Sequence, residues 1–359
     1  MAITLIRMFG DRSYGLNGIF SPKPKVVCPK IVTQGLFGAK KQYLTRQYPT
    51  KWVNLLQNQT TTNPPFMELR IQNLTKTYSN GVKALDDVNL TIPRGMFGLL
   101  GPNGAGKSTL MRTIATLQEA DKGSVRLGEL DVLQHPMEVR KQLGYLPQEF
   151  GVYPKISAYD MLDHIAILKG IRQDRKALVE ELLKRVNLWE VRKKALGGFS
   201  GGMKQRFGIA QALIGDPKLI IVDEPTAGLD PGERNRFYNL LSEIGEQVIV
   251  ILSTHIVEDV KELCSQMAII DRGRVLFAGS PAEALAQVHH KIWTSSVPKN
   301  RLQELTAQWP VISTRMVAGQ PVVHVFGDEQ PDQGFVSAEA DLEDVFFMYI
   351  KGFNKPAKA

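Results

Sequence analysis

Long apolar runs and cysteine are scarce in this chain of 359 residues. No apolar run approaches the roughly 18 residues that a membrane-spanning helix needs. The best candidates, residues 219–222 and 247–252, have the length of buried strands. Only two cysteines are present, Cys28 and Cys264, and they lie far apart with no metal-ligand spacing, which favours free thiols in a reducing compartment. If the protein acts at a membrane, we expect a partner to supply the spanning helices.

Acidic residues are nearly absent from the first 66 positions. This segment holds nine of the 44 lysines and arginines but only one of the 36 acids, Asp11, so the remaining residues carry 35 of each. The net charge of +8 is therefore confined to a basic appendage. An appendage of this kind is not a basic binding face, and we expect no nucleic acid partner.

The same segment, residues 1–66, has no sustained hydrophobic periodicity and no apolar stretch typical of a secretory signal. Four interpretations stay open: a disordered tail, translated sequence upstream of a start at Met67, an organelle-targeting segment, and an interaction segment. We expect a chain shortened to Met67 to fold and to keep its activity.

A regular pattern begins at Met67. Residues 67–74 alternate apolar and polar side chains, as a half-buried strand does, and a second strand-like run at 88–92 ends in a turn. The pattern is mainly helical from 136 to 215, and buried-strand runs and helices alternate from 219 to 279. This order predicts a mostly parallel α/β core interrupted by a helical insertion.

The pattern changes again after about residue 285. Alternation on both sides of a turn at Gly319-Gln320-Pro321 predicts strands, and the apolar stretch 342–350 predicts a helix. We therefore divide the chain into an N-terminal extension (1–66), a main domain (67–285) and a small C-terminal accessory module (286–359).

A glycine-rich loop follows a short apolar strand at 96–100. It matches the phosphate-loop pattern GxxxxGK[ST] and reads Gly101, Pro102, Asn103, Gly104, Ala105, Gly106, Lys107, Ser108, Thr109. Glycines let several amide N–H groups point at phosphates, and the helix expected from Lys107 adds its positive end. We predict that Lys107 reaches the β and γ phosphates of a nucleotide and that Ser108 coordinates Mg²⁺.

Two adjacent carboxylates, Asp223 and Glu224, end the apolar strand at 219–222. Because neighbouring residues of a strand point to opposite sides, we expect Asp223 to face the Mg²⁺ ion and Glu224 to reach toward an attacking water. An acid that holds the metal and an acid that orients or deprotonates the water are what ATP hydrolysis requires. Without the phosphate loop, the pair would more simply be a solvated strand end.

Between these motifs lies the sequence Phe199-Ser200-Gly201-Gly202-Met203, which resembles the LSGGQ signature of ABC ATPases. Phe199 and Met203 depart from the leucine and glutamine that are usual in the family. The serine and both glycines remain, so a hydroxyl and a helix N-terminus can still bind phosphate. We expect altered packing at Phe199 and no loss of activity.

Other family motifs follow in matching order over residues 67–285. Tyr78 resembles the aromatic residue that stacks on adenine, and Gln148 resembles the Q-loop glutamine that senses Mg²⁺ and the membrane partner. Asp230 ends a sequence that resembles the D-loop, and His255 resembles the H-loop histidine that contacts the γ phosphate. Each residue alone has an ordinary structural explanation, and it is their order and spacing that carry the resemblance.

The resemblance implies a set of site residues. The catalytic residues would be Glu224, His255 and Gln148, and the Mg²⁺ ligands would be Ser108, Gln148 and Asp223. The residues that bind the nucleotide would be Tyr78, the loop 101–109, Ser200, Gly201, Gly202 and Asp230.

The resemblance also implies a fold and a function. The fold would be a P-loop ABC ATPase core with a mostly parallel sheet, an antiparallel β subdomain and a helical insertion, followed by the small C-terminal appendage. The function would be that of an ATP-hydrolysing subunit of an ABC transporter, using ATP and Mg²⁺. Its partners would be a separate transmembrane permease and a second nucleotide-binding subunit, identical or different, at the cytoplasmic face of the cell membrane.

Two other classes of function fit less well. Chromosome and DNA-repair ABC ATPases insert long coiled coils between the phosphate loop and the signature, and the separation of Lys107 from Ser200 leaves no room for one. Translation factors of this type carry two nucleotide domains, whereas this chain has one phosphate loop. A nucleotide-binding regulator without turnover is disfavoured by Glu224 and His255. Residues 148–154, 199–203 and 342–346 resemble exporter-type subunits, so we favour export over import.

Overall fold

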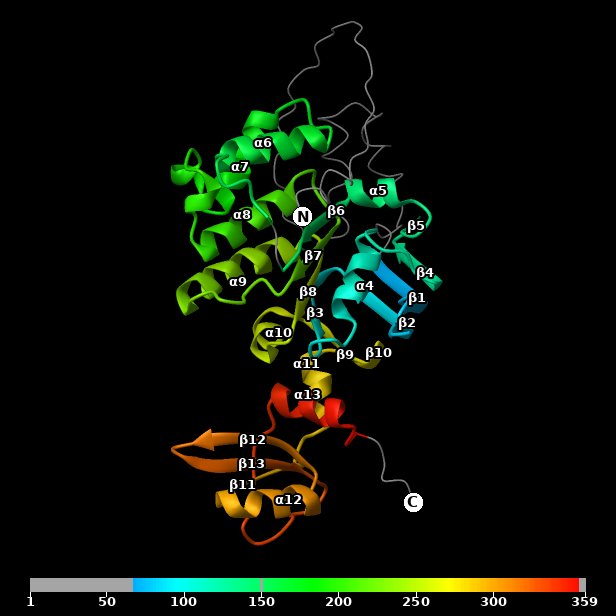
Figure 1. Cartoon of the computed structure of the whole chain (residues 1–359), viewed down its shortest axis with the longest axis vertical. Helices are drawn as coiled ribbons and strands as arrows, with labels where there is room; N and C mark the ends of the chain where they lie inside the picture. Colours follow the sequence, from blue (N-terminus) through cyan, green and yellow to red (C-terminus); the bar gives the residue numbers. More distant parts are fainter. Residues whose placement is uncertain (1–66, 149–150, 355–359) are drawn as a thin grey trace, which may run out of the picture. The chain divides into compact units, whose positions relative to one another are not determined.

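The computed structural model describes residues 67–148 and 151–354 (Figure 1). The expectations for residues 1–66, including Cys28, lie outside the described residues, as do Glu149 and Phe150 in the segment after Gln148. None of the helices in the described residues is long and apolar enough to cross a membrane.

A six-stranded sheet forms the centre of the main domain, in the order β10-β9-β3-β8-β7-β6. Its strands are β3 (Gly95–Leu100), β6 (Leu143–Leu146), β7 (Leu219–Asp223), β8 (Ile249–Thr254), β9 (Gln266–Asp271) and β10 (Arg274–Gly279). All neighbours pair in parallel except β9 and β10, which pair antiparallel. The predicted mostly parallel sheet is confirmed.

Both faces of this sheet are covered. Along β7, Ile220 and Val222 belong to one apolar cluster, whereas Leu219 and Ile221 belong to another on the opposite face. The strand is therefore apolar throughout and not alternating, as parallel strands covered on both sides are. The flanking helices are α4 (Lys107–Ile114), α5 (Pro136–Lys141), α9 (Pro231–Gly245), α10 (Val257–Leu263) and α11 (Pro281–Ala286).

The second sheet is antiparallel, in the order β2-β1-β4-β5. Its strands are β1 (Glu68–Thr77), β2 (Lys83–Pro93), β4 (Lys122–Leu127) and β5 (Leu130–Asp131). Leu69, Ile71, Leu85 and Val125 are fully buried or nearly so and join the cluster beneath α4. The antiparallel β subdomain is thus confirmed, and it packs against the helix that follows the phosphate loop.

Helices dominate residues 158–213, as the pattern predicted. They are α6 (Ala158–Leu168), α7 (Arg175–Arg185) and α8 (Gly201–Leu213), with short 3-10 turns η1 (Trp189–Val191) and η2 (Leu196–Gly198). The wider prediction of a mainly helical segment from 136 to 215 missed β6, which has only four residues. A strand this short shows no periodicity of its own, and it is defined by its pairing with β7.

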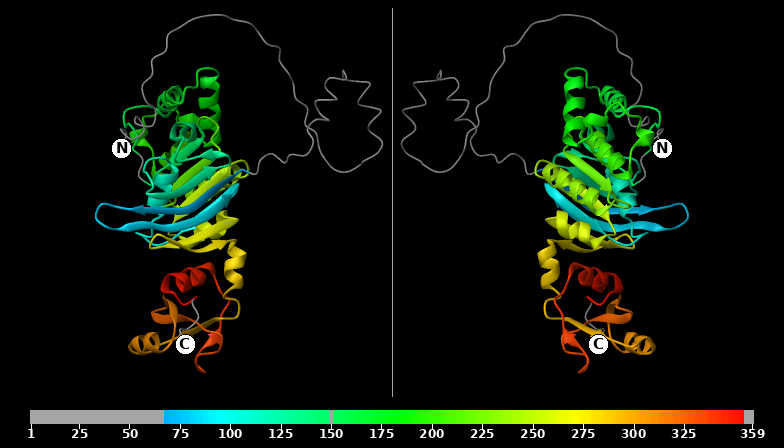
Figure 2. Two further views of the ribbon diagram at one scale, coloured as in Figure 1. Left: turned by 90° about the vertical axis from the view of Figure 1, so that its right-hand side faces the viewer. Right: turned by 90° about the vertical axis from the view of Figure 1, so that its left-hand side faces the viewer.

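The C-terminal residues form a third sheet, in the order β12-β13-β11-β14. Figure 2 shows these residues, coloured from orange to red, in two further views. Its elements are β11 (Ile292–Ser296), η3 (Lys299–Arg301), α12 (Leu302–Gln308), β12 (Val311–Val317), β13 (Gln320–Phe326), β14 (Val336–Ser337) and α13 (Leu342–Lys351). The predicted turn is displaced by about one residue, because Ala318 and Gly319 have positive φ while Gln320 and Pro321 belong to β13. The division of the chain at residues 66 and 285 stays a prediction.

Helix α13 packs on the main domain through its apolar side chains. Leu342, Val345 and Met348 are buried and share one apolar cluster with residues of β8 and α10. The Tyr349 hydroxyl donates a hydrogen bond to Gln287 Oε1 at 2.5 Å, next to the end of α11. The helix therefore joins the C-terminal sheet to the core of the main domain.

Candidate active site

The phosphate-loop residues connect β3 to α4. Gly104 and Gly106 have φ values of 81° and 107°, which lie in the left-handed region that favours glycine. A Cβ atom on Gly106 would lie 2.4 Å from the Ala84 carbonyl oxygen, and one on Gly101 would lie 2.4 Å from the Ile270 carbonyl oxygen. Dihedral angles and lack of space thus both require glycine here, and the backbone can approach an anion closely.

Lys107 is the first residue of α4 and is only 6% exposed. Its ammonium group donates hydrogen bonds to the carbonyl oxygens of Gly101, at 2.5 Å, and Pro102, at 3.1 Å. Burial lowers the pKa of Lys107, and the nearby carboxylates of Glu224 and Asp223 oppose this shift. A phosphate at the loop would give this buried cation a partner of opposite charge.

A cavity of about 610 Å³ lies over the loop. Its lining includes Tyr78, residues 103–109, Gln148 and Glu224, so it brings together four separate parts of the predicted site. The Tyr78 hydroxyl is within hydrogen-bond distance of Thr109 Oγ1, at 3.1 Å, and donates to Gln118 Oε1 at 3.0 Å. Tyr78 is 38% exposed and lines the cavity, so its ring is available for a flat ligand to stack on.

The sequence prediction missed another part of the lining, the turn between β9 and β10. Arg272 and Gly273 line the cavity, together with Lys83 and Ala84 of β2. The Gly273 N–H donates to the Ala105 carbonyl oxygen at 2.8 Å, so this turn supports the phosphate loop directly. The available signal was a glycine between two strand-like runs, which predicts a hairpin and says nothing about its distant contact.

Glu224 lies just beyond the end of β7. It has a φ of 47°, in the left-handed region, and its N–H donates to the Ser253 carbonyl oxygen of β8 at 2.8 Å. Strand alternation is the cause that the sequence predicts for the different directions of the Asp223 and Glu224 side chains, and this cause is wrong. The strand ends at Asp223, and a left-handed backbone turn sets the direction of the Glu224 side chain.

Two predicted site residues contact the Glu224 carboxylate, one on each oxygen. Gln148 Nε2 donates to Oε2 at 2.9 Å, and His255 Nδ1 lies 3.0 Å from Oε1. The three residues follow β6, β7 and β8, which are neighbours in the sheet. Their meeting at the carboxyl ends of parallel strands is the usual position of a ligand site in an α/β sheet.

Asp223, the last residue of β7, is buried with 7% exposure. Burial raises the pKa of Asp223, and the Glu224 carboxylate acts in the same direction, while Lys107 and Arg112 oppose the shift. The cost of holding two carboxylates here would fall in the presence of a cation. A hydroxyl, an amide oxygen and a carboxylate, from Ser108, Gln148 and Asp223, are oxygen donors of the kind that Mg²⁺ prefers.

Comparison with known proteins gives the family. Residues 85–227 match the protein family described as ABC transporter. The ABC transporter ATP-binding protein NatA of Bacillus subtilis (strain 168) is 40% identical to this chain over 203 residues, covering 55% of the chain and 82% of NatA. The chain belongs to the ABC transporter ATP-binding proteins. It is an ABC-type ATPase and an ATP-binding subunit of a transporter, as the sequence motifs predicted.

Other ABC proteins show comparable similarity. The daunorubicin/doxorubicin resistance ATP-binding protein DrrA of Streptomyces peucetius is 32% identical over 270 residues, covering 74% of this chain and 79% of DrrA. The methionine import ATP-binding protein MetN 1 of Burkholderia ambifaria is 36% identical over 251 residues, covering 66% of this chain and 72% of that protein. An ATP-binding cassette solved as a dimer with ADP and Pi matches with a TM-score of 0.54 and 26% identity, over 59% of this chain and 98% of the cassette.

The signature of this ABC ATPase begins helix α8. The Ser200 hydroxyl caps the helix by accepting a hydrogen bond from the Met203 N–H at 3.3 Å. The atypical Phe199 is 5% exposed, and its ring meets that of Phe207 edge-on at 6.5 Å between centroids. Phe199 therefore packs as one member of an aromatic pair, and the expected change in packing relative to leucine stays a prediction.

The signature and the D-loop residue are not in the lining of the nucleotide cavity in the part of the chain that the structure describes. Asp230 caps α9 by accepting a hydrogen bond from the Glu233 N–H at 2.9 Å, and its surface is exposed. Glu233 also packs on Gly202, where a Cβ atom would meet Glu233 Oε2 at 2.4 Å. Both motifs are thus fixed relative to each other through α8 and α9, away from the cavity that Lys107 lines.

Proposed function

We propose that this subunit hydrolyses ATP in the cavity above the phosphate loop. In this proposal Glu224 is the central catalytic residue, and contacts to both of its carboxylate oxygens hold it in position. The supporting observation is that Gln148 and His255 approach opposite oxygens of this carboxylate, and that Glu224 and Gln148 line the same cavity as Lys107 and Ser108. Carboxylates held in this way beside a phosphate-binding loop are suited to orient water.

The proposed roles follow from these positions. The amides of residues 101–109 and the Lys107 ammonium bind the phosphates, and Tyr78 stacks on the adenine ring. Glu224 orients the water and accepts its proton as the water oxygen attacks the γ-phosphorus and the bond to the β-phosphate oxygen breaks. His255 holds Glu224 and contacts the γ phosphate. Products are ADP and inorganic phosphate.

Mg²⁺ would be held by Ser108, Gln148 and Asp223. When bound, the ion would neutralise phosphate charge. The buried Asp223 carboxylate, whose pKa burial raises, would gain a charged partner on binding it.

We further propose that two such subunits sandwich two ATP molecules, with Ser200, Gly201, Gly202 and Asp230 completing the site of the partner subunit. The exposed D-loop and the position of the signature outside the cavity support this arrangement, and a related cassette forms a dimer. Closure on ATP and reopening after hydrolysis would drive a separate permease at the cytoplasmic face of the membrane.

Export is the proposed direction. DrrA, a resistance protein, aligns with 74% of this chain, against 66% for MetN, whose name describes methionine import. The sequence at 342–346 also resembles exporter-type subunits. Import is the second candidate because MetN has the higher identity, 36% against 32%.

Two measurements test the proposal. ATP hydrolysis by the purified chain should require Mg²⁺, rise more steeply than linearly with protein concentration, and disappear in Lys107→Ala. Direction can be tested in cells by comparing small molecules in the wild type and in Lys107→Ala: an exporter predicts a compound that accumulates inside the mutant. A compound that is depleted from the mutant would instead indicate import. A hydrolysis rate that rises only linearly with protein concentration would argue against the proposed dimer.

A further inference from the structure

Helix α10, which begins two residues after His255, carries a fully buried carboxylate. Asp259 has 0% exposure and lies in the first turn of the helix, directly before the buried Val260. In residues 67–148 and 151–354 its hydrogen-bond partners are three side-chain hydroxyls. A charged group this deeply buried is costly unless its hydrogen bonds are satisfied.

The three hydroxyls come from three different segments. Thr226 Oγ1 donates to Asp259 Oδ2 at 2.6 Å, and Thr254 Oγ1 donates to the same oxygen at 3.0 Å. The Tyr238 hydroxyl of α9 donates to Oδ1. Thr226 and Thr254 are each 1% exposed, so solvent does not compete for these bonds.

Two of these segments hold the proposed catalytic residues. Thr226 is two residues beyond Glu224, and Thr254 directly precedes His255. The Thr254 hydroxyl also accepts a hydrogen bond from the Ile256 N–H at 2.9 Å, which closes the turn that presents His255. One carboxylate oxygen of Asp259 thus connects the loop after β7 with the end of β8.

We propose that Asp259 is a positioning residue that holds Glu224 and His255 at hydrogen-bond distance from each other. The inference rests on the roles proposed for these two residues. Glu224 occupies a left-handed conformation that is strained for a non-glycine residue and must be held by its surroundings. The loop after β7 is connected to the end of β8 directly, by the hydrogen bond from the Glu224 N–H to the Ser253 carbonyl oxygen, and a second time through Asp259.

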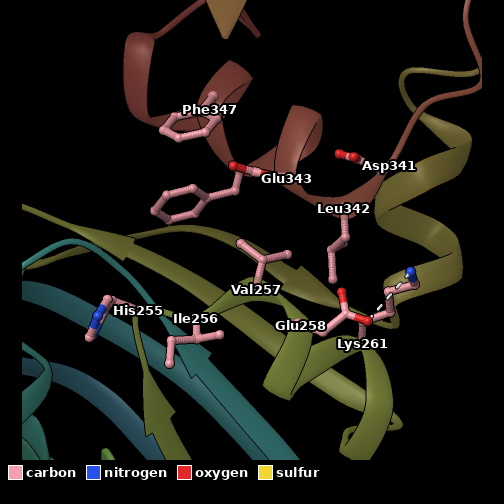
Figure 3. Close-up of a pocket in the computed structure, with 10 residues that line it drawn as sticks. His255, Ile256, Val257, Glu258, Lys261, Asp341, Leu342, Glu343 and Phe347 are labelled. Carbon is pink, nitrogen blue, oxygen red and sulfur yellow. Dashed lines mark ion pairs between the residues drawn. The ribbon is translucent and has the colours of Figure 1, made fainter. Parts of the chain in front are cut away.

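The outer face of α10 offers a matched control. Figure 3 shows Glu258 and Lys261 in a pocket between this helix and α13, which Leu342 and Glu343 also line. Glu258 is exposed, and its carboxylate lies 3.8 Å from the Lys261 ammonium group. Glu258→Gln therefore removes a neighbouring acid from the same helix without touching the hydroxyls around Asp259.

The test compares Asp259→Asn, Thr254→Val, the double variant and Glu258→Gln in steady-state ATP hydrolysis by the full chain. We expect Asp259→Asn to lower kcat by roughly tenfold to 100-fold, because small displacements of catalytic groups are costly, and to leave KM for ATP within about twofold. We expect Thr254→Val to lower kcat in the same way. The double variant should lose less than the sum of the two single losses, since both substitutions remove the Thr254–Asp259 hydrogen bond and Thr254→Val also removes the acceptor of the Ile256 N–H.

Three results would overturn the proposal: a folded Asp259→Asn with kcat near that of the wild type, a rise in KM that matches the fall in kcat, or additive losses in the double variant. A loss as large in Glu258→Gln would also contradict it. If Asp259→Asn does not fold, Thr254→Val alone decides, because it leaves two donors to the carboxylate in place. Hydrolysis that persists in Glu224→Gln would instead refute the proposed function, so the two failures are distinguishable.

Discussion

His255 Nδ1 lies 3.0 Å from Glu224 Oε1, although the two residues belong to loops that follow different strands. Those strands, β7 and β8, are parallel neighbours, with Asp223 of β7 paired with Ser253 of β8. The contact is thus a consequence of sheet register, which places the residues after both strands at the same edge. It brings a candidate base and a candidate contact for the γ phosphate to one side of the phosphate loop.

Replacement of Glu224 by glutamine should separate ATP binding from ATP hydrolysis. The amide keeps the shape of the side chain but cannot accept a proton from water, so we expect turnover to fall by at least about 100-fold. ATP-dependent dimerisation, measured by size-exclusion chromatography with light scattering, should persist. Glu246→Gln, at an exposed acid after α9, is the control. Robust turnover by Glu224→Gln would remove the residue from the proposed catalytic role.

Two glycines of the phosphate loop should respond differently to alanine. Gly104 and Gly106 both have left-handed φ, so either substitution should cost about 1 kcal/mol of unfolding free energy. Only at Gly106 would the added Cβ meet a backbone oxygen, at 2.4 Å, whereas at Gly104 nothing lies within 4 Å. We expect Gly106→Ala to lose more stability and nucleotide affinity, as measured by urea unfolding and fluorescent-nucleotide titration. Equal effects at both positions would contradict the steric argument.

Phe199→Leu would introduce the residue that is usual at this position in the family. The change removes the edge-on contact with Phe207, which contributes about 1 kcal/mol beyond area burial in typical aromatic pairs. We expect a loss of unfolding free energy of this order in urea, with ATP hydrolysis preserved because Ser200, Gly201 and Gly202 are unchanged. A large fall in turnover without loss of stability would show that Phe199 acts on the signature directly.

The phosphate loop could be predicted from sequence because it is contiguous: its glycines, Lys107 and Ser108 are neighbours in the chain, and one pattern contains them all. The contacts of Glu224 could not be predicted from sequence. They depend on the order of β6, β7 and β8, and β6 is too short to be recognised by periodicity.

Other contacts of the site could not be predicted from sequence either, because they also join residues that are distant in the chain. Gly273 supports the phosphate loop from a hairpin turn that is distant in sequence, and the bonds of Asp259 join three segments. The left-handed conformation of Glu224 had no sequence signal, since glutamate rarely adopts it. Sequence patterns identify the chemical groups, whereas the packing of the sheet and helices determines which of them meet.

The C-terminal module should be sensitive to pH through His324. Its Nδ1 lies 2.8 Å from the buried Asp344 Oδ1, and this hydrogen bond raises the pKa of His324 above 6.5. Burial and Arg315 oppose the shift, and Asp341 supports it. Because the folded state binds the proton more tightly, the stabilisation is complete below about pH 6.5 and is lost as the pH rises through the folded-state pKa.

Hydrogen exchange of the α13 amides measures this effect. After correction for intrinsic rates, protection should be lower at about pH 8.5 than at about pH 6 in the wild type, and His324→Gln should abolish the difference. His289→Gln, at an exposed histidine, should behave like the wild type. An unchanged pH dependence in His324→Gln would assign the effect to another group.

The most direct test of the central claim is an affinity purification of the tagged full-length chain from detergent-solubilised native membranes, followed by mass spectrometry of the proteins that accompany it. If this chain is the ATP-hydrolysing subunit of a transporter, we expect to recover an integral membrane protein with several spanning helices in a stable complex with it. Recovery of soluble or nucleic-acid-associated partners alone would contradict the proposed permease and the proposed place at the membrane.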